Sequence, residues 1–211
     1  MRQLSKALLA VATIGFPATL VAISPPPQAQ EKRITTEAIL NDPQVPVAGN
    51  PQGDITIVAF FDYNCPFCKQ SAPALEKLVK ADGKIRLVYK DWPILTAASM
   101  HGAQLALAAK YQGKYEAVHQ ALMGIPGRRI SKEQMTEAVK GTGVDVERLR
   151  QDLKQHAPEI VSLIQRNLDQ ADALGLQGTP VFLVGPFKVA ASLDYEGFRK
   201  VVAEARAKQK Q

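Results

Sequence analysis

Two cysteines separated by two residues, in the motif Cys65-Pro66-Phe67-Cys68, constrain this chain more than any other feature of its sequence. The run just before them, residues 55–61, is β-branched and aromatic on both faces, which is typical of a central strand in a covered sheet. After the motif, apolar residues recur at helical spacing at Leu75, Leu78 and Val79. The cysteine pair is therefore predicted where a strand gives way to a helix.

This position suits thiol–disulfide chemistry. The free backbone N–H groups and the dipole at a helix N-terminus stabilise a thiolate, which is the form that attacks a disulfide. Cys65 is therefore predicted to be the nucleophile. Cys68, one helical turn further on, is predicted to resolve the mixed disulfide. Pro66 fits the first helical turn, where an N–H group would have no partner.

Three other interpretations of the pair compete with a redox centre. A purely structural disulfide would close a very short loop and would constrain the unfolded chain little. A zinc site needs further ligands, but there is no second cysteine pair, and His101, His119 and His156 are distant in the sequence. Buried free thiols do not suit a close pair in an oxidising compartment. The spacing therefore favours a redox centre, and no metal is assigned.

The N-terminal residues 1–29 have the build of a secretory signal peptide. Arg2 and Lys6 give it a positive start, a run of apolar residues from Ala7 to Ile23 follows, and cleavage is predicted after Ala29. An uncleaved membrane anchor is the alternative, although the apolar run is short for a span and carries helix breakers. We therefore expect export to the periplasm, where disulfides persist.

The charge pattern of the chain argues against a surface that binds nucleic acid or a membrane. The formal net charge is +6, and removal of the signal peptide would leave 24 basic and 20 acidic residues. The basic residues alternate with acidic ones along the helical stretches, whereas a footprint needs them clustered. No nucleic-acid partner is expected.

The order of predicted elements indicates a small α/β sheet with an all-helical insertion. A polar N-terminal extension, residues 30–53, precedes the domain at 54–211. A strand, a helix and a second strand at 85–90 come first, and the helical insertion follows at about 96–174. A hairpin at 181–189 and a closing helix from about Asp194 complete the order.

The segment around the cysteines resembles the DsbA-like family of bacterial periplasmic disulfide oxidoreductases; it reads Phe60-Phe61-Asp62-Tyr63-Asn64-Cys65-Pro66-Phe67-Cys68-Lys69. That family has a thioredoxin-like fold interrupted by a helical domain. The segments Ile39-Leu40-Asn41-Asp42-Pro43 and Lys90-Asp91-Trp92-Pro93-Ile94-Leu95 look closest to its ScsC-like copper-sensitivity branch. The resemblance covers about residues 35–205.

A second motif, Gly178-Thr179-Pro180, precedes a predicted strand. The resemblance implies that Pro180 is cis, faces the cysteines and belongs to the catalytic set with them. It also implies that the backbone of Thr179 pairs with a bound substrate strand. Pro66 and Phe67 are assigned to substrate binding beside Thr179, and Tyr63 is considered as a further exposed apolar contact.

The sequence departs from the family pattern at one important position. Related enzymes often carry a buried acid six residues before the nucleophile, and here that residue is Ala59. Asp62 is expected at an exposed strand end, where it is no clear substitute. Lys90 matches a basic residue that many members keep near the active site, and a simple surface lysine is the equal alternative.

These observations predict an enzyme that exchanges a dithiol and a disulfide with reduced or misoxidised exported proteins. It would need no dissociable cofactor, would work as a monomer and would be recycled by a membrane redox partner. A reductase or isomerase of the same fold is one alternative. A Cu(I)-binding copper-tolerance protein is another, since two thiolates suit a soft ion. The apolar Phe67 predicts a reduction potential between those of strong oxidants and reductants.

Overall fold

The computed structural model describes residues 34–210. The predicted signal peptide lies outside the described residues. Within them, no helix is both long enough and apolar enough to cross a membrane. The elements are, in chain order, α1 (Thr36–Leu40), β1 (Val47–Gly49), β2 (Ile55–Phe61), α2 (Pro66–Asp82), β3 (Ile85–Asp91), α3 (Ala97–Ala109), the 3-10 helix η1 (Lys110–Gln112), α4 (Tyr115–Gly124), α5 (Lys132–Lys140), α6 (Val146–Gln155), α7 (Ala157–Ala173), β4 (Val181–Val184), β5 (Phe187–Val189) and α8 (Tyr195–Gln209).

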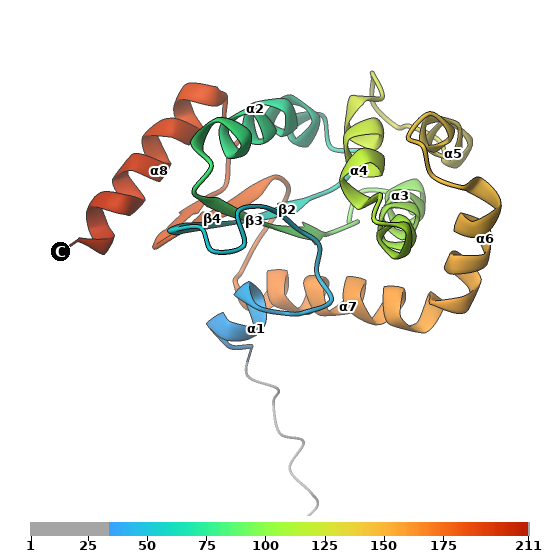
Figure 1. The fold of residues 1–211 in the computed structure, drawn as a ribbon, viewed down its shortest axis with the longest axis horizontal. Coiled ribbons are helices and arrows are strands. Elements are labelled where there is room, and N and C mark those ends of the chain that lie inside the picture. The colour runs from blue at the N-terminus through green and yellow to red at the C-terminus, as the bar shows by residue number, and fades with distance from the viewer. Residues whose placement is uncertain (1–33, 211) are drawn as a thin grey trace, which may run out of the picture. The chain divides into compact units, whose positions relative to one another are not determined.

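The strands form one mixed sheet in the order β1-β3-β2-β4-β5. β2 and β3 are parallel, in a register that sets Ile55 beside Ile85 and Phe61 beside Asp91, and the other pairings are antiparallel. Figure 1 shows α2 and α8 on one face of the sheet and α1 and α7 on the other. This double cover explains why β2 is apolar on both faces, as its sequence predicted.

Elements α3 to α7 lie between β3 and β4 in the chain and occupy the helical insertion expected at about 96–174. The helix starts follow local capping chemistry. Ser131 and Gln134 form the predicted capping box of α5, and the side chain of Asp145 caps α6 through Arg148 N–H. The fold is thus the thioredoxin-like α/β architecture with a helical insertion that the sequence predicted.

The short strand β1 was not predicted. It pairs Val47 with Val88 and Gly49 with Arg86 of β3, so its structure depends on a partner far along the chain. The turn predicted at 49–53 overlaps the end of β1 at Gly49, which has φ +71° and where a Cβ atom would clash with the Ile85 carbonyl oxygen.

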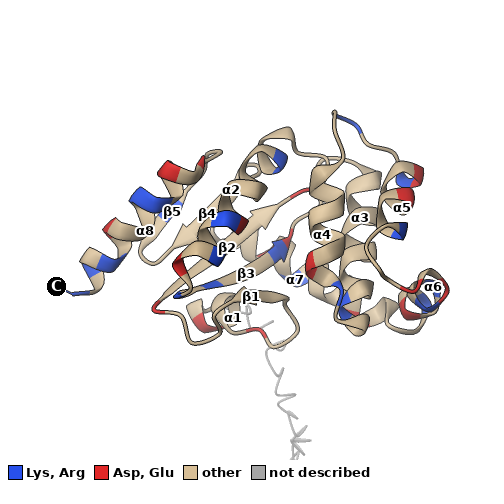
Figure 2. Cartoon of the chain, turned by 45° about the horizontal axis from the view of Figure 1, so that its top comes forward, with Lys and Arg blue, Asp and Glu red and all other residues tan. Residues whose placement is uncertain are grey.

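The last helix is fixed to the sheet layer by apolar contacts and by ion pairs. The rings of Phe198 and Phe182 pack edge to face with centroids 4.9 Å apart. Arg206 donates hydrogen bonds to both Asp54, just before β2, and Asp82, at the end of α2. Elsewhere, Figure 2 shows positive and negative residues side by side along α6 and α8, in line with the mixed surface expected from the sequence.

Candidate active site

Cys65 occupies the N-cap position of α2, and Pro66 is the first residue of the helix. The Cys65 Sγ atom accepts a hydrogen bond from the backbone N–H of Cys68, at 3.3 Å. Both cysteines are free thiols, and each is buried. The strand-to-helix junction predicted from the sequence therefore places both sulfurs in the first turn of the helix.

The two thiols have opposite electrostatic environments. The pKa of Cys65 is lowered to about 6, first by a hydrogen bond with the Cys68 thiol and then, against the raising effect of burial, by the Thr179 side chain and the backbone N–H groups of Cys68 and Phe67. Burial raises the pKa of Cys68 well above its ordinary value, and the neighbouring Cys65 raises it further. Near neutral pH, Cys65 is therefore the thiolate of the pair and Cys68 keeps its proton.

The Thr179–Pro180 segment lies against the cysteines although it is more than a hundred residues away in the chain. The peptide bond between these two residues is cis, as the resemblance implied. The Cys65 thiol lies 3.2 Å from the Thr179 carbonyl oxygen, to which its S–H form donates. The structure therefore brings Thr179 directly to the predicted nucleophile.

A surface groove of about 490 Å³ opens beside this contact. Phe67 forms one side of it, and the chain from Gly175 to Val181 forms another. The Phe67 side chain is 55% exposed, which agrees with its expected place at the surface of the site. Tyr63 is different: it is buried, and its hydroxyl lies 3.1 Å from His119 Nδ1. The suggestion that Tyr63 is exposed is therefore wrong.

The turn between β2 and α2 is held by Asp62 and Asn64. Asp62 accepts hydrogen bonds from the N–H groups of Asn64, Ile94 and Leu95, at 2.7, 2.9 and 2.9 Å. It is buried, so the expectation of an exposed strand end is wrong. Through these hydrogen bonds the Asp62 carboxylate links the active-site turn to the loop after β3.

Asn64 adds a second attachment, this time to the helical insertion. Its side chain accepts a bond of 2.6 Å from Ile130 N–H and donates to the Ile130 carbonyl and to Thr96 Oγ1. Asn64 was not predicted as a site residue, because its partners are 32 and 66 positions away and leave no local pattern.

Lys90 is fully buried, so the surface interpretation is wrong. Its pKa is lowered to about 8, mainly by burial, and the charged groups that act on it are Asp42, Arg166 and Arg86. Asp42 belongs to the N-terminal extension, Arg166 to α7 and Arg86 to β3 itself. Among the described residues its Nζ atom has no hydrogen-bond partner.

A small, partly open cavity of about 20 Å³ is lined by Cys68. Ala59 lines it, at the position where related enzymes often carry an acid, and so do Glu76 and His119. Neither Glu76 nor His119 was predicted as a site residue. Glu76 had a usable signal, since it lies eight positions after Cys68 and therefore on the same face of α2.

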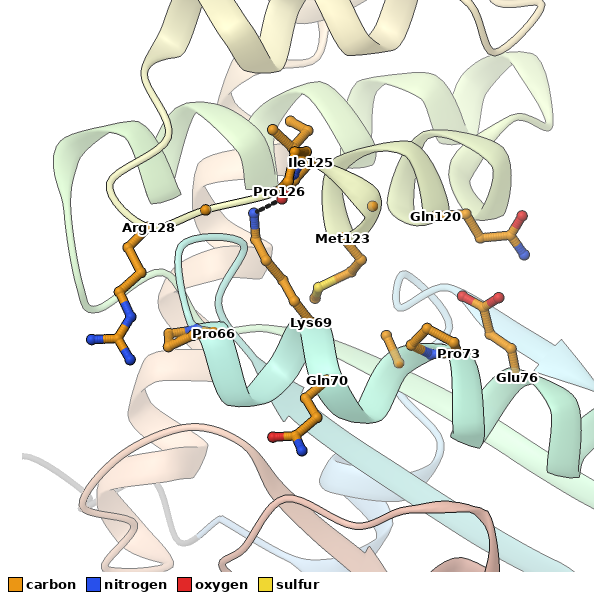
Figure 3. A pocket seen from close by; sticks show the side chains of 13 residues that line it. Pro66, Lys69, Gln70, Pro73, Glu76, Gln120, Met123, Ile125, Pro126 and Arg128 are labelled. Carbon is orange, nitrogen blue, oxygen red and sulfur yellow. Dashed lines mark hydrogen bonds between the residues drawn. The ribbon is translucent and has the colours of Figure 1, made fainter.

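A larger groove, of about 580 Å³, runs between the start of α2 and the end of α4 (Figure 3). Lys69 spans it and donates a hydrogen bond of 2.6 Å to the Ile125 carbonyl. Glu76 and Gln120 line its far end. Within the described part of the chain, no group of three or more His, Cys, Asp or Glu side chains is arranged to hold a metal ion.

Comparison with known proteins places this site in a family. A family model described as thioredoxin matches residues 41–204. The thiol:disulfide interchange protein DsbA of Bordetella parapertussis is 30% identical over 95% of this chain and 92% of its own. Na(+)/H(+) antiporter NhaA 1 of Salinispora arenicola is 26% identical over 93% of this chain, which spans only 32% of that protein's length.

Two solved structures have the same fold. A thioredoxin-like oxidoreductase from Silicibacter pomeroyi matches with a TM-score of 0.76 and 41% identity, over 82% of this chain and 99% of its own. The catalytic domain of Proteus mirabilis ScsC matches with a TM-score of 0.71 and 26% identity, over 81% and 94%. With the matching family model and the two adjacent thiols, these likenesses show that the chain belongs to the thioredoxin family, among the DsbA-like thiol–disulfide oxidoreductases.

Proposed function

We propose that this protein is exported to the periplasm and exchanges a disulfide with protein substrates through Cys65 and Cys68. The observation that carries the proposal is the placement of the two thiols: Cys65 lies at the N-cap of α2 and accepts the Cys68 N–H, which lowers its pKa, while Cys68 is buried, which raises its pKa. The Cys65 thiolate at the helix start attacks a substrate disulfide. The protonated Cys68 thiol then resolves the mixed disulfide that forms.

The groove beside Cys65 supports a polypeptide as the substrate. It is lined mostly by apolar side chains and by exposed backbone, with Phe67 on one side and Thr179 and Pro180 on the other. We assign Pro180 to the catalytic set and Pro66, Phe67 and Thr179 to substrate binding. An extended chain lying along Thr179 would bring its own sulfur next to Cys65.

Two substitutions test this assignment. Cys65→Ser should abolish both insulin reduction and dithiol oxidation. Cys68→Ser should keep the attacking thiolate but lose the resolver, so that mixed disulfides with substrates accumulate and are seen by mass spectrometry. Full activity in Cys65→Ser would contradict the proposal.

The direction of electron flow is a separate part of the proposal. We expect an oxidase that passes its electrons to a membrane redox partner and works as a monomer. Equilibration of the pair with a glutathione buffer measures the reduction potential, and a value near that of thioredoxin, about −270 mV, would favour the reductase alternative. If both cysteine variants left exchange unchanged while Cu(I) protected the two thiols from alkylation, the copper-binding alternative would replace it.

A further inference from the structure

Resolution of a mixed disulfide requires Cys68 to lose a proton inside the protein. Cys68 is only 3% exposed, and burial raises its pKa, so its thiol cannot simply ionise into solvent. This requirement follows from the proposed exchange reaction and rests on it. Related enzymes often carry an acid six residues before the nucleophile, where it can accept this proton, but in this chain that residue is Ala59.

Cys68 and one carboxyl group line the same small, partly open cavity. Its volume of about 20 Å³ is enough for one water molecule. Glu76 is the only Asp or Glu among the described residues that line it. Glu76 also lines two outer grooves, of about 580 and 620 Å³, and in Figure 3 its side chain projects from α2 toward α4. This carboxyl group therefore borders both the small cavity at Cys68 and the outer grooves.

The other polar side chains of the cavity are poor proton acceptors. Burial lowers the pKa of His119 to about 3, and its Nδ1 atom lies within hydrogen-bond distance of the Tyr63 hydroxyl. Burial raises the pKa of the Tyr89 hydroxyl, so that group stays protonated. Burial also raises the pKa of Glu76, which makes its carboxylate a stronger base than an exposed one.

We propose that Glu76 takes the proton of Cys68 through one water molecule in this cavity, in place of the acid missing at position 59. The Cys68 sulfur attacks the Cys65 sulfur of the mixed disulfide, and its proton passes through the water to the Glu76 carboxylate. The Cys65–Cys68 bond forms as the bond between Cys65 and the substrate breaks. The substrate sulfur leaves with the electron pair as a thiolate and is protonated by solvent, so Cys68 is oxidised and the substrate reduced. In the reverse direction Glu76 returns the proton to the leaving Cys68.

The charged and titratable groups around Glu76 come from three elements and a loop. β3 and α4 meet it in the cavity and in the grooves, and the loop after α4 closes one groove. Glu116 raises the Glu76 pKa further, as a like charge does. The groups are Lys69, Lys77 and Lys80 of α2, Tyr89 of β3, Glu116 and His119 of α4, and Arg128 of the loop.

The test measures the resolution step alone. Reduced protein is mixed with oxidised glutathione, and the mixed disulfide is followed by acid quench and mass spectrometry at a series of pH values. In the native protein the resolution rate should be level at high pH and should fall at low pH, where Glu76 is protonated. Glu76→Gln should slow resolution about 10²-fold at neutral pH and replace the level region by a rate that rises about tenfold per pH unit.

A matched variant and a rescue separate this role from a structural one. Glu116→Gln, an exposed change on α4, should keep the maximum rate and move the fall to lower pH, because it removes the like charge that raises the Glu76 pKa. Ala59→Asp added to Glu76→Gln should restore a level region, since residue 59 lines the same cavity.

The proposal is overturned by a native-like profile in Glu76→Gln. It is also overturned if the native rate itself rises tenfold per pH unit throughout, a result that needs no variant. Failure of the mixed disulfide to form at all would contradict the proposed exchange reaction instead.

Discussion

The central parallel strands β2 and β3 both end in buried charged residues, and the two ends are built in opposite ways. Asp62 follows β2 and accepts three backbone N–H groups. Lys90 and Asp91 close β3, and within the described residues the Lys90 Nζ and one oxygen of Asp91 have no hydrogen-bond partner. Burial lowers the pKa of Lys90 to about 8 and raises that of Asp91 to about 7.

This difference separates two uses of buried charge. At the end of β2 the carboxylate is a structural acceptor that fixes the turn carrying Cys65. At the end of β3 the polar groups are poorly solvated, so their protonation changes near neutral pH. We therefore expect substitutions at the two ends to have opposite effects on the free energy of unfolding.

The largest effect is expected at the β2 end. Asp62→Ala should lower the free energy of unfolding by about 4 kcal/mol, because it leaves three N–H groups without their acceptor and each costs about 1–3 kcal/mol. Guanidinium unfolding measures the change. The exposed Asp169→Ala should change it by less than about 0.5 kcal/mol. A loss below about 1 kcal/mol in Asp62→Ala would show that water replaces the carboxylate.

The β3 end should respond in the opposite direction. Lys90→Met should raise the free energy of unfolding by about 3 kcal/mol at pH 7, because it removes a buried amine and keeps an apolar chain of similar length. The folded-state pKa, about 8, lies below the unfolded value. The unfolded state therefore binds more protons, and the native protein gains stability as pH rises from about 8 to about 10.4.

The gain from Lys90→Met should accordingly be full below about pH 8 and absent above about pH 10.4. Urea unfolding at pH 7 and pH 10.5 measures this difference. Lys80→Met, on the exposed face of α2, should show neither the gain nor its pH dependence. A destabilised Lys90→Met protein would indicate that the amine has a favourable partner, such as Asp42, in the folded state.

The sequence predicted much of this arrangement and failed where contacts are long-range. The spacing of Cys65 and Cys68 after an apolar run predicted the central strand, the helix start and the position of both thiols. The same reasoning placed Asp62 and Tyr63 at an exposed end, although both are buried. Their surroundings are supplied by the loop after β3 and by α4, whose positions depend on how the whole insertion packs.

Glu76 and β1 illustrate the same limit. The face of α2 shared by Cys68 and Glu76 follows from helical periodicity, but that periodicity does not show that residue 59 lies across a cavity from them. The strand β1 has only three residues, so its existence depends on pairing with β3. Local patterns therefore predicted the elements, while the burial of polar side chains between elements required the structure.

The smallest effect on stability is expected at Phe67, in the turn of helix that follows β2. Its side chain is 55% exposed, so Phe67→His should change the free energy of unfolding by less than about 0.5 kcal/mol. An imidazolium there adds a positive charge beside Cys65, where the only stabilisation of the thiolate now comes from hydrogen bonds and the helix start. The Cys65 pKa should fall below about 6, and the reduction potential should become less negative by about 30 mV for each 1.4 kcal/mol of added thiolate stabilisation.

Thiolate absorbance against pH and equilibration with glutathione measure the two quantities, and Phe67→Leu, which adds no charge, should move neither. If Phe67→His and Phe67→Leu behaved alike, charge at this exposed position would not set the reduction potential, which would instead depend on the hydrogen bonds that the Cys65 sulfur makes with Cys68 and the Thr179 side chain.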